Sequence, residues 1–299
     1  MAKLKSWIKA ARLRTLPLAL SSIAMGGFLA ATKDNFNLLP VVLAALTTLF
    51  LQILSNMAND YGDSKSGIDN KDRLGPTRTV QSGEISSSEM KFAVILFALL
   101  SFVSGLVLVF LASGLSLIFS LVFVLVGIGA IGAAINYTIG KNPYGYAGFG
   151  DLFVFIFFGL VGVAGTFFLA TKTLSTDVFL PASAMGLLST GVLNLNNLRD
   201  FENDKANGKN TIVVKVGSKM AVHYQFFLVL TSFLLLIVYN LLNYSELYQI
   251  IFVLLLPLFV IDLIKIRQTE ELAKLDPFLK KLAMKTLLLT FVFGLCNLI

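Results

Sequence analysis

Nine long apolar segments dominate the chain, and shorter polar stretches separate them. A helix that crosses a lipid bilayer needs about 20 predominantly apolar residues, and each segment has roughly that length. The segments cover residues 15–31, 38–58, 92–111, 115–138, 152–170, 178–198, 221–242, 247–266 and 282–299. The pattern therefore predicts an all-α integral membrane protein, a nine-transmembrane-helix bundle that forms a single domain over residues 1–299.

The composition supports a membrane protein and excludes several other classes. Hydrophobic residues make up 56% of the chain and charged residues only 14%, whereas soluble proteins carry about 25% charged residues. This shortage of charge also excludes a disordered chain, and a single cysteine excludes a disulfide-stapled secreted domain. The net charge of +7 would suit a nucleic-acid binder if the basic residues formed a patch, so their positions decide its meaning.

The basic residues fall almost entirely on one side of the predicted bundle. When the nine segments are threaded through a membrane, 22 of the 24 Lys and Arg residues lie on the side of the N-terminus, and only Lys33 and Lys172 lie opposite. Cytoplasmic loops carry the excess of Lys and Arg. We therefore predict a cytoplasmic N-terminus and an outer C-terminus in the inner (cytoplasmic) membrane, with no nucleic-acid partner.

The first segment follows a basic arm, as a secretory signal peptide would. No small-residue cleavage site follows it, so we expect a membrane anchor instead. The arm around Trp7 mixes basic and apolar residues and is expected to lie along the membrane interface.

A first polar cluster follows the second segment and reads Asn56-Met-Ala-Asn59-Asp60-Tyr-Gly-Asp63. On a helix, Gln52, Asn56, Asp60 and Asp63 are predicted to share one face. Carboxylates at the end of a membrane helix are costly unless a cation occupies the site.

A second cluster lies 140 residues later, between the sixth and seventh segments. It comprises Asn196, Asn197, Arg199, Asp200 and Asp204, of which Asn196, Asp200 and Asp204 are spaced by four. The two clusters indicate an internal pseudo-repeat, with helices 1–4 over about residues 1–140, helices 5–8 over about 150–267, and helix 9 added.

Carboxylate and amide oxygens without nearby His or Cys favour Mg²⁺, which binds through a few carboxylates plus substrate phosphates. The clusters are therefore predicted to hold a diphosphate through Mg²⁺, with nearby cations binding phosphate oxygens; these cations are Lys71, Arg73, Arg78, Arg199 and Lys209. The alternative is structural, namely carboxylates that pair with basic loop residues at the headgroup level.

A tyrosine-rich turn lies between the fourth and fifth segments. Tyr137, Lys141 and Tyr144 are candidates for binding substrate oxygens there, although tyrosines are also common interfacial anchors. Two glycine stripes, Gly127-x-Gly129-x-x-Gly132 and Gly159/Gly162/Gly165, are expected to allow close helix packing. Ser86-x-x-Glu89 is expected to be a capping box that begins the third helix.

Together these motifs resemble the UbiA superfamily of intramembrane prenyltransferases over nearly the whole chain. The family's first motif matches Asn59-Asp60-x-x-Asp63 and its second matches Asp200-x-x-x-Asp204. The menaquinone branch is the most similar, on Gly67-x-Asp69, Arg73-x-Gly-Pro-x-Arg78, Pro143-Tyr-Gly-Tyr146 and Gly208-Lys-x-Thr211. This chain departs from the family pattern at position 67, where glycine replaces the third acidic residue, and Asp151 stands at an acidic position of undefined role.

The resemblance implies transfer of a polyprenyl group from its diphosphate to 1,4-dihydroxy-2-naphthoate, with loss of carbon dioxide, giving a demethylmenaquinone. It implies that Mg²⁺ binds at Asp60, Asp63, Asp69, Asp200 and Asp204, and that Tyr137 and the four motif aspartates other than Asp69 are catalytic. Asn56, Asn59, Asn196 and Asn197 would join the basic residues in substrate binding. The alternatives are a prenyltransferase for 4-hydroxybenzoate or homogentisate, and a membrane transporter, which would place its substrate site near the midplane.

Overall fold

Over the residues that the structure describes, the protein is an all-helical bundle with nine helical segments long and apolar enough to cross a membrane, as predicted. The computed structural model describes residues 2–67, 74–112, 114 and 116–299, and all statements below concern these residues. The spans run over Leu4–Ala31, Leu38–Ser66, Ser87–Leu111, Leu117–Asn136, Gly150–Thr171, Thr176–Arg199, Ser218–Leu242, Leu247–Gln268 and Leu272–Leu298.

The helices of the first half begin with a short helix in the basic arm around Trp7. They are α1 (Leu4–Ala11), the 3₁₀ turn η1 (Leu13–Thr15), α2 (Leu16–Ala31), α3 (Leu38–Ser66), α4 (Ser87–Leu111) and α5 (Leu117–Asn136). Ser86 caps α4, and its side chain and that of Glu89 exchange hydrogen bonds with each other's backbone N–H groups. The predicted capping box is therefore confirmed.

The second half contains several breaks that hydropathy alone does not reveal. Its elements are η2 (Tyr144–Tyr146), α6 (Gly150–Val154), η3 (Phe155–Gly165), α7 (Thr166–Thr171), η4 (Thr176–Val178), α8 (Phe179–Arg199), α9 (Phe201–Ala206), α10 (Ile212–Val216), α11 (Ser218–Leu242), η5 (Leu247–Leu255), α12 (Leu256–Gln268), η6 (Leu272–Leu275) and α13 (Asp276–Leu298). The fifth span contains a π-helix, η3, where the sequence predicts one regular helix.

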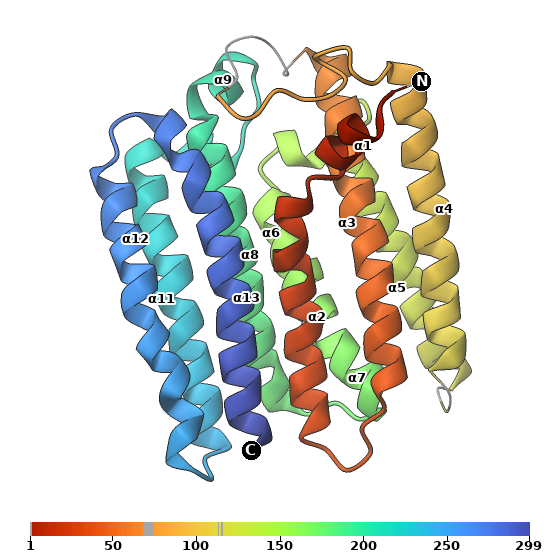
Figure 1. Cartoon of the computed structure of the whole chain (residues 1–299), viewed down its shortest axis with the longest axis vertical. Coiled ribbons are helices and arrows are strands. Elements are labelled where there is room, and N and C mark those ends of the chain that lie inside the picture. The colour runs from red at the N-terminus through yellow and green to blue at the C-terminus, as the bar shows by residue number, and fades with distance from the viewer. Residues whose placement is uncertain (1, 68–73, 113, 115) are drawn as a thin grey trace.

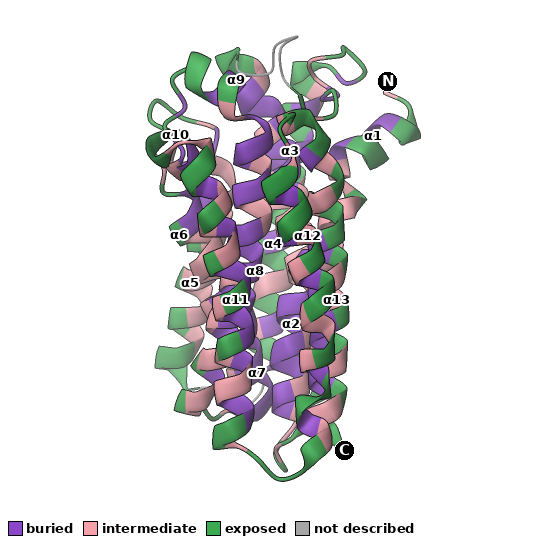
Figure 2. Cartoon of the chain, turned by 90° about the vertical axis from the view of Figure 1, so that its left-hand side faces the viewer, coloured by how far each residue is buried: buried purple, intermediate pink, exposed green. Residues whose placement is uncertain are grey.

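The two ends of the chain lie at opposite ends of the bundle (Figure 1). The C-terminal end of α3 and the short helix α9 lie at the same end of the bundle, so the regions that follow the second and sixth spans are on the same side. Buried residues are concentrated in the middle of the bundle, notably on α2 and α8 (Figure 2). The outer helical faces expose many large apolar side chains, as expected where lipid is the solvent.

The two glycine stripes differ in their surroundings. A Cβ on Gly159 would lie 2.6 Å from the carbonyl oxygen of Ala182, and one on Gly162 would lie 3.1 Å from the Cβ of Ser22. These two glycines do allow close packing, as expected. The prediction is wrong for Gly127, Gly129 and Gly132, because a Cβ on any of them would meet nothing within 4 Å. Gly129 is exposed and Gly127 lines the large cavity described below, so neither faces a neighbouring helix closely.

This difference gives a direct test of packing. We expect Gly159→Ala to lower the thermal stability of the purified protein, because helix η3 would have to move away from α8. The control is Gly129→Ala, which adds the same methyl group at an exposed position. It should be neutral or stabilising by up to about 1 kcal/mol, the helix-propensity difference between alanine and glycine. Equal melting temperatures for the two variants would contradict this packing account.

Candidate functional site

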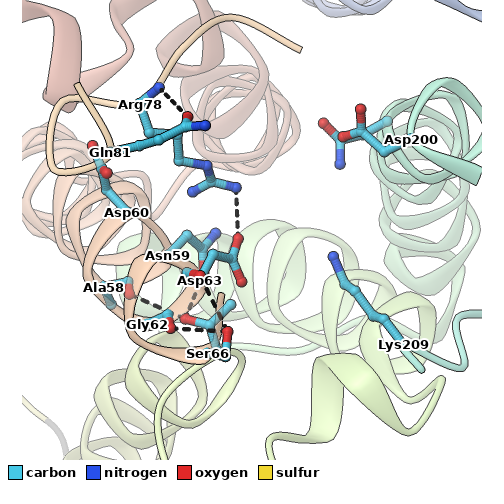
Figure 3. A network of polar contacts seen from close by, with 12 residues as sticks. Ala58, Asn59, Asp60, Gly62, Asp63, Ser66, Arg78, Gln81, Asp200 and Lys209 are labelled. Atoms are coloured by element: carbon cyan, nitrogen blue, oxygen red, sulfur yellow. Dashed lines mark hydrogen bonds and ion pairs between the residues drawn. The ribbon is translucent and has the colours of Figure 1, made fainter. Parts of the chain in front are cut away.

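The two acidic clusters meet at the end of the bundle that carries α9. Helix α3 continues past the apolar segment as far as Ser66, so Asp60 and Asp63 lie on a helix rather than in a loop. Asp200 lies between α8 and α9, and Asp204 lies within α9. Figure 3 shows Asp63 and Arg78 on one side of a gap, with Asp200 and Lys209 on the other.

Asp63 is the centre of the first cluster. Its Oδ2 accepts a hydrogen bond from Arg78 Nη2 at 2.6 Å, and its Oδ1 accepts one from the Tyr146 hydroxyl at 2.7 Å. Both Asp63 and Arg78 are buried. Burial and the charge of Asp63 raise the pKa of Tyr146, so this phenol remains a hydrogen-bond donor to the carboxylate. The sequence assigned no role to Tyr146, although its motif was noted.

Asp60 faces away from the gap, and the expectation that it shares one face with Gln52 and Asp63 is wrong. Its carboxylate accepts hydrogen bonds from the Thr79 hydroxyl at 2.6 Å, the Thr79 amide at 3.1 Å and the Val80 amide at 3.3 Å. At about 100° per residue, Asp60 is rotated by about 80° from Gln52, whereas Asp63 is rotated by only about 20°. Asp60 therefore anchors the loop that carries Arg78.

In the second cluster, Asp204 is the carboxylate that is least neutralised. It is buried, its Oδ2 has no hydrogen-bond partner, and its Oδ1 lies 3.5 Å from Lys209 Nζ. Burial, against the attraction of Lys209, raises the pKa of Asp204 to about 6, and the charge of Asp200 adds to this rise. A bound cation would stabilise the ionised form of such a carboxylate.

Asp200 is paired with its neighbour Arg199. The guanidinium donates from Nε to Asp200 Oδ1 at 3.0 Å and from Nη2 to Oδ2 at 2.6 Å. Arg199 is completely buried, so it holds Asp200 rather than presenting a free cation to phosphate. Lys209 does face the gap, where it also lies 5.6 Å from the centre of the Tyr146 ring.

A cavity of about 390 Å³ extends from this gap into the bundle. Its polar end is lined by Asn59, Asp63, Arg78, Asn196 and Lys209. The wall on α3 includes positions 44, 48, 52, 56, 59 and 63. At 1.5 Å per residue, Ala44 to Asp63 spans about 28 Å of helix, close to the roughly 30 Å thickness of a bilayer's hydrocarbon core. The deeper wall is mostly apolar, with Ile23, Leu108, Phe123 and Leu169 among its residues.

Aromatic rings line the cavity below the carboxylates. Tyr144 stacks on Phe153 with ring centres 4.1 Å apart and contacts Tyr137 edge-on at 5.4 Å. Burial and the charge of Asp63 raise the pKa of Tyr137, which keeps the phenol protonated. The Tyr144 hydroxyl donates to the carbonyl oxygen of Ala133 at 2.9 Å, so its ring rather than its hydroxyl is presented to the cavity.

The remaining sequence-predicted residues occupy different positions. Asn56 lines the cavity, and its amide donates to the Ala11 carbonyl oxygen and the Thr15 hydroxyl, which fixes the N-terminal arm. Asn197 is buried outside the cavity lining, and Lys141 is exposed. Asp69, Lys71 and Arg73 lie outside the described residues.

The carboxylates of the site are not preassembled as a metal centre. No group of three or more His, Cys, Asp or Glu residues within the described ranges is already arranged to hold a metal ion. The carboxylates are instead partly neutralised by Arg78, Arg199 and Lys209. The buried, unpartnered Asp204 oxygen and the exclusively oxygen donors nevertheless fit a hard cation such as Mg²⁺.

The sequence pattern of the UbiA prenyltransferase family matches residues 19–289. The chain belongs to the UbiA prenyltransferase family. Within it, the chain is 43% identical over 296 residues to a 1,4-dihydroxy-2-naphthoate octaprenyltransferase of Haemophilus influenzae, covering 98% of this chain and 96% of that protein. It is 41% identical over 297 residues to a protein of the same name from Escherichia coli, covering 99% and 96%.

Solved structures of the family share the fold. A UbiA homolog from Archaeoglobus fulgidus, bound to DMAPP and Mg²⁺, matches with a TM-score of 0.65 and 18% identity, covering 98% of this chain and 99% of that chain. Another structure of a UbiA homolog from that organism gives a TM-score of 0.68, with the same identity and coverage. The chain is therefore a multi-pass membrane protein with the UbiA fold.

Proposed function

We propose that this UbiA family member transfers a polyprenyl group from its diphosphate to 1,4-dihydroxy-2-naphthoate, releasing carbon dioxide and giving the quinol form of a demethylmenaquinone. The observation that carries this proposal is the cavity, whose polar end is lined by Asp63 of the first cluster and by Asn196 and Lys209 beside the second. From there the wall follows α3 for about 28 Å and becomes mostly apolar. Its shape and polarity match a diphosphate with a long isoprenoid tail. The naphthoate acceptor is supported by the names of the relatives that are 41–43% identical over nearly the full chain.

In the proposed reaction, the bond between the prenyl C1 and the diphosphate oxygen breaks, and its electron pair leaves with the diphosphate. A ring carbon of the naphthoate bonds to C1, and the carboxyl group leaves as carbon dioxide. Mg²⁺, when bound, would neutralise the charge that develops on the leaving diphosphate. Asp63, Asp200 and Asp204 are the residues that would hold it.

The other residues of the site would orient the donor and protect it. Arg78 and Lys209 reach the gap and would bind diphosphate oxygens. The rings of Tyr137, Tyr144 and Phe153 present π-faces and edges to the cavity, and aromatic faces attract a developing allylic cation. The apolar wall below them would keep water from that cation.

We further propose that the site faces the cytoplasm and that the chain lies in the inner membrane, N-terminus inside. The support is the 22-to-2 distribution of Lys and Arg. The two halves, over about residues 1–140 and 150–267, would be repeats that each contribute one acidic cluster.

The decisive experiment supplies purified protein with labelled octaprenyl diphosphate, Mg²⁺ and each aromatic acid in turn. We expect a prenylated product with 1,4-dihydroxy-2-naphthoate and release of labelled carbon dioxide from its carboxyl group. Product from 4-hydroxybenzoate or homogentisate alone would show that the acceptor is a different aromatic acid, while the protein would still be a prenyltransferase. No product with any acid would overturn the proposed function.

A further inference from the structure

Asp276, the first residue of α13, lies outside both acidic motifs but is joined to the second of them. Its Oδ1 accepts a hydrogen bond from Arg199 Nη1 at 2.5 Å, and its Oδ2 accepts one from Arg14 Nη1 at 3.3 Å. Asp276 thus connects three parts of the chain: η1, which carries Arg14, the end of α8, which carries Arg199, and α13 itself.

The buried cation in this network is shared between two carboxylates. Arg199 is completely buried and contacts both oxygens of Asp200, one oxygen of Asp276, and the side-chain oxygen of Asn196 at 3.0 Å. A buried guanidinium is costly unless it is well paired. Because Asp276 accepts one of the three hydrogen bonds that Arg199 donates to carboxylates, Arg199 does not depend on Asp200 alone.

Asp200 has a competing role in the proposed function, on which this inference rests. There it must offer oxygens to a cation, although both of its oxygens now accept hydrogen bonds from Arg199. We propose that Asp276 is a positioning residue that shares the charge of Arg199 and thereby leaves Asp200 able to bind a divalent cation. A neutral residue at 276 would leave Arg199 held by Asp200 more tightly, so Asp200 would bind a cation more weakly.

The link to Arg14 extends this role to the cavity. Arg14 lines the cavity together with Leu279 and Lys280 of α13. The carboxylate of Asp276 therefore contacts both Arg14, which lines the cavity, and Arg199, which pairs with Asp200. A residue that served only to cap α13 would need neither contact.

The test measures metal binding without any prenyl substrate. Mn²⁺, a paramagnetic substitute for Mg²⁺, is titrated into the purified full-length protein in lipid nanodiscs, and free Mn²⁺ is followed by electron paramagnetic resonance. We expect Asp276→Asn to weaken Mn²⁺ binding by about tenfold or more, the usual range for residues that support a metal ligand. Asp276→Glu, which keeps the charge, should restore most of the affinity.

The matched control is Asp262→Asn. Asp262 on α12 is paired with Lys285 on α13 at 2.6 Å, so this variant also breaks an ion pair that involves α13, but Asp262 does not line the cavity. We expect it to change thermal stability and leave Mn²⁺ binding unaltered. The inference would be overturned if Asp276→Asn bound Mn²⁺ as the wild type does, if both variants weakened binding equally, or if the wild type bound no Mn²⁺.

The same preparations separate this inference from the proposed function. A wild-type protein that binds Mn²⁺ with the expected variant pattern, yet transfers no prenyl group to any aromatic acid, would support the role of Asp276 and refute the proposed reaction. Prenyl transfer by a protein whose Mn²⁺ affinity is insensitive to Asp276→Asn would support the proposed reaction and refute the role of Asp276.

Discussion

Replacing Asp63 with asparagine should lower the rate of prenyl transfer by about a hundred- to a thousandfold, the usual cost of removing one preorganised electrostatic group from an active site. Asparagine keeps the shape of the side chain, but it removes the charge that holds Arg78 and would hold Mg²⁺. The measurement is the transfer rate of purified protein over a range of Mg²⁺ concentrations.

Asp177→Asn is the control for this prediction, because Asp177 lies in the first turn of the sixth span, at the end opposite Arg199 and Asp200. It should retain normal transfer. Near-normal turnover of Asp63→Asn at saturating Mg²⁺ would refute the assignment of the metal site to this cluster.

Asp60→Ala should also remove most activity, by roughly a hundredfold, but for a different reason. The carboxylate receives three hydrogen bonds from Thr79 and Val80, and these fix the loop that brings Arg78 to Asp63. Hydrogen bonds to charged groups contribute about 1.5–3 kcal/mol each, so thermal stability should fall together with activity.

Thr79→Val distinguishes this anchoring role from direct metal binding by Asp60. It keeps the carboxylate but removes the 2.6 Å hydroxyl contact, and we expect about a tenfold loss of activity, equivalent to about 1.4 kcal/mol. The control is Thr286→Val, a buried threonine on α13 whose hydroxyl bonds only within its own helix. Wild-type activity of Thr79→Val would mean that Asp60 acts through the metal rather than through the loop.

The sequence predicted the nine spans because membrane thickness and the absence of water impose a length and a polarity on each helix. The capping box at Ser86 was also predictable, because it depends on residues three positions apart. The convergence of the two acidic clusters followed from threading the chain, since both fall on the same side of the membrane.

Other features depend on packing that no local pattern specifies. Spacing by four suggested that Asp60 shares a face with Gln52, but its hydrogen-bond partners Thr79 and Val80 lie in a loop 19 and 20 positions later, which helix spacing does not reveal. Asp276 lies 76 positions after Asp200 and outside any motif, so only the tertiary structure brings it to Arg199. The open surroundings of Gly129 were likewise not predictable, because a glycine stripe permits close packing but does not show whether another helix lies against it.

The cavity is lined by residues from seven of the nine spans, and within the described part of the chain α11 and α12 contribute none of them. These two helices therefore support the bundle without forming part of the cavity wall. Substitutions on them should change the thermal stability of the protein in a membrane without changing which product it makes. Attempts to redirect the enzyme toward other donors or acceptors would then be concentrated on the other seven spans, whose side chains line the cavity.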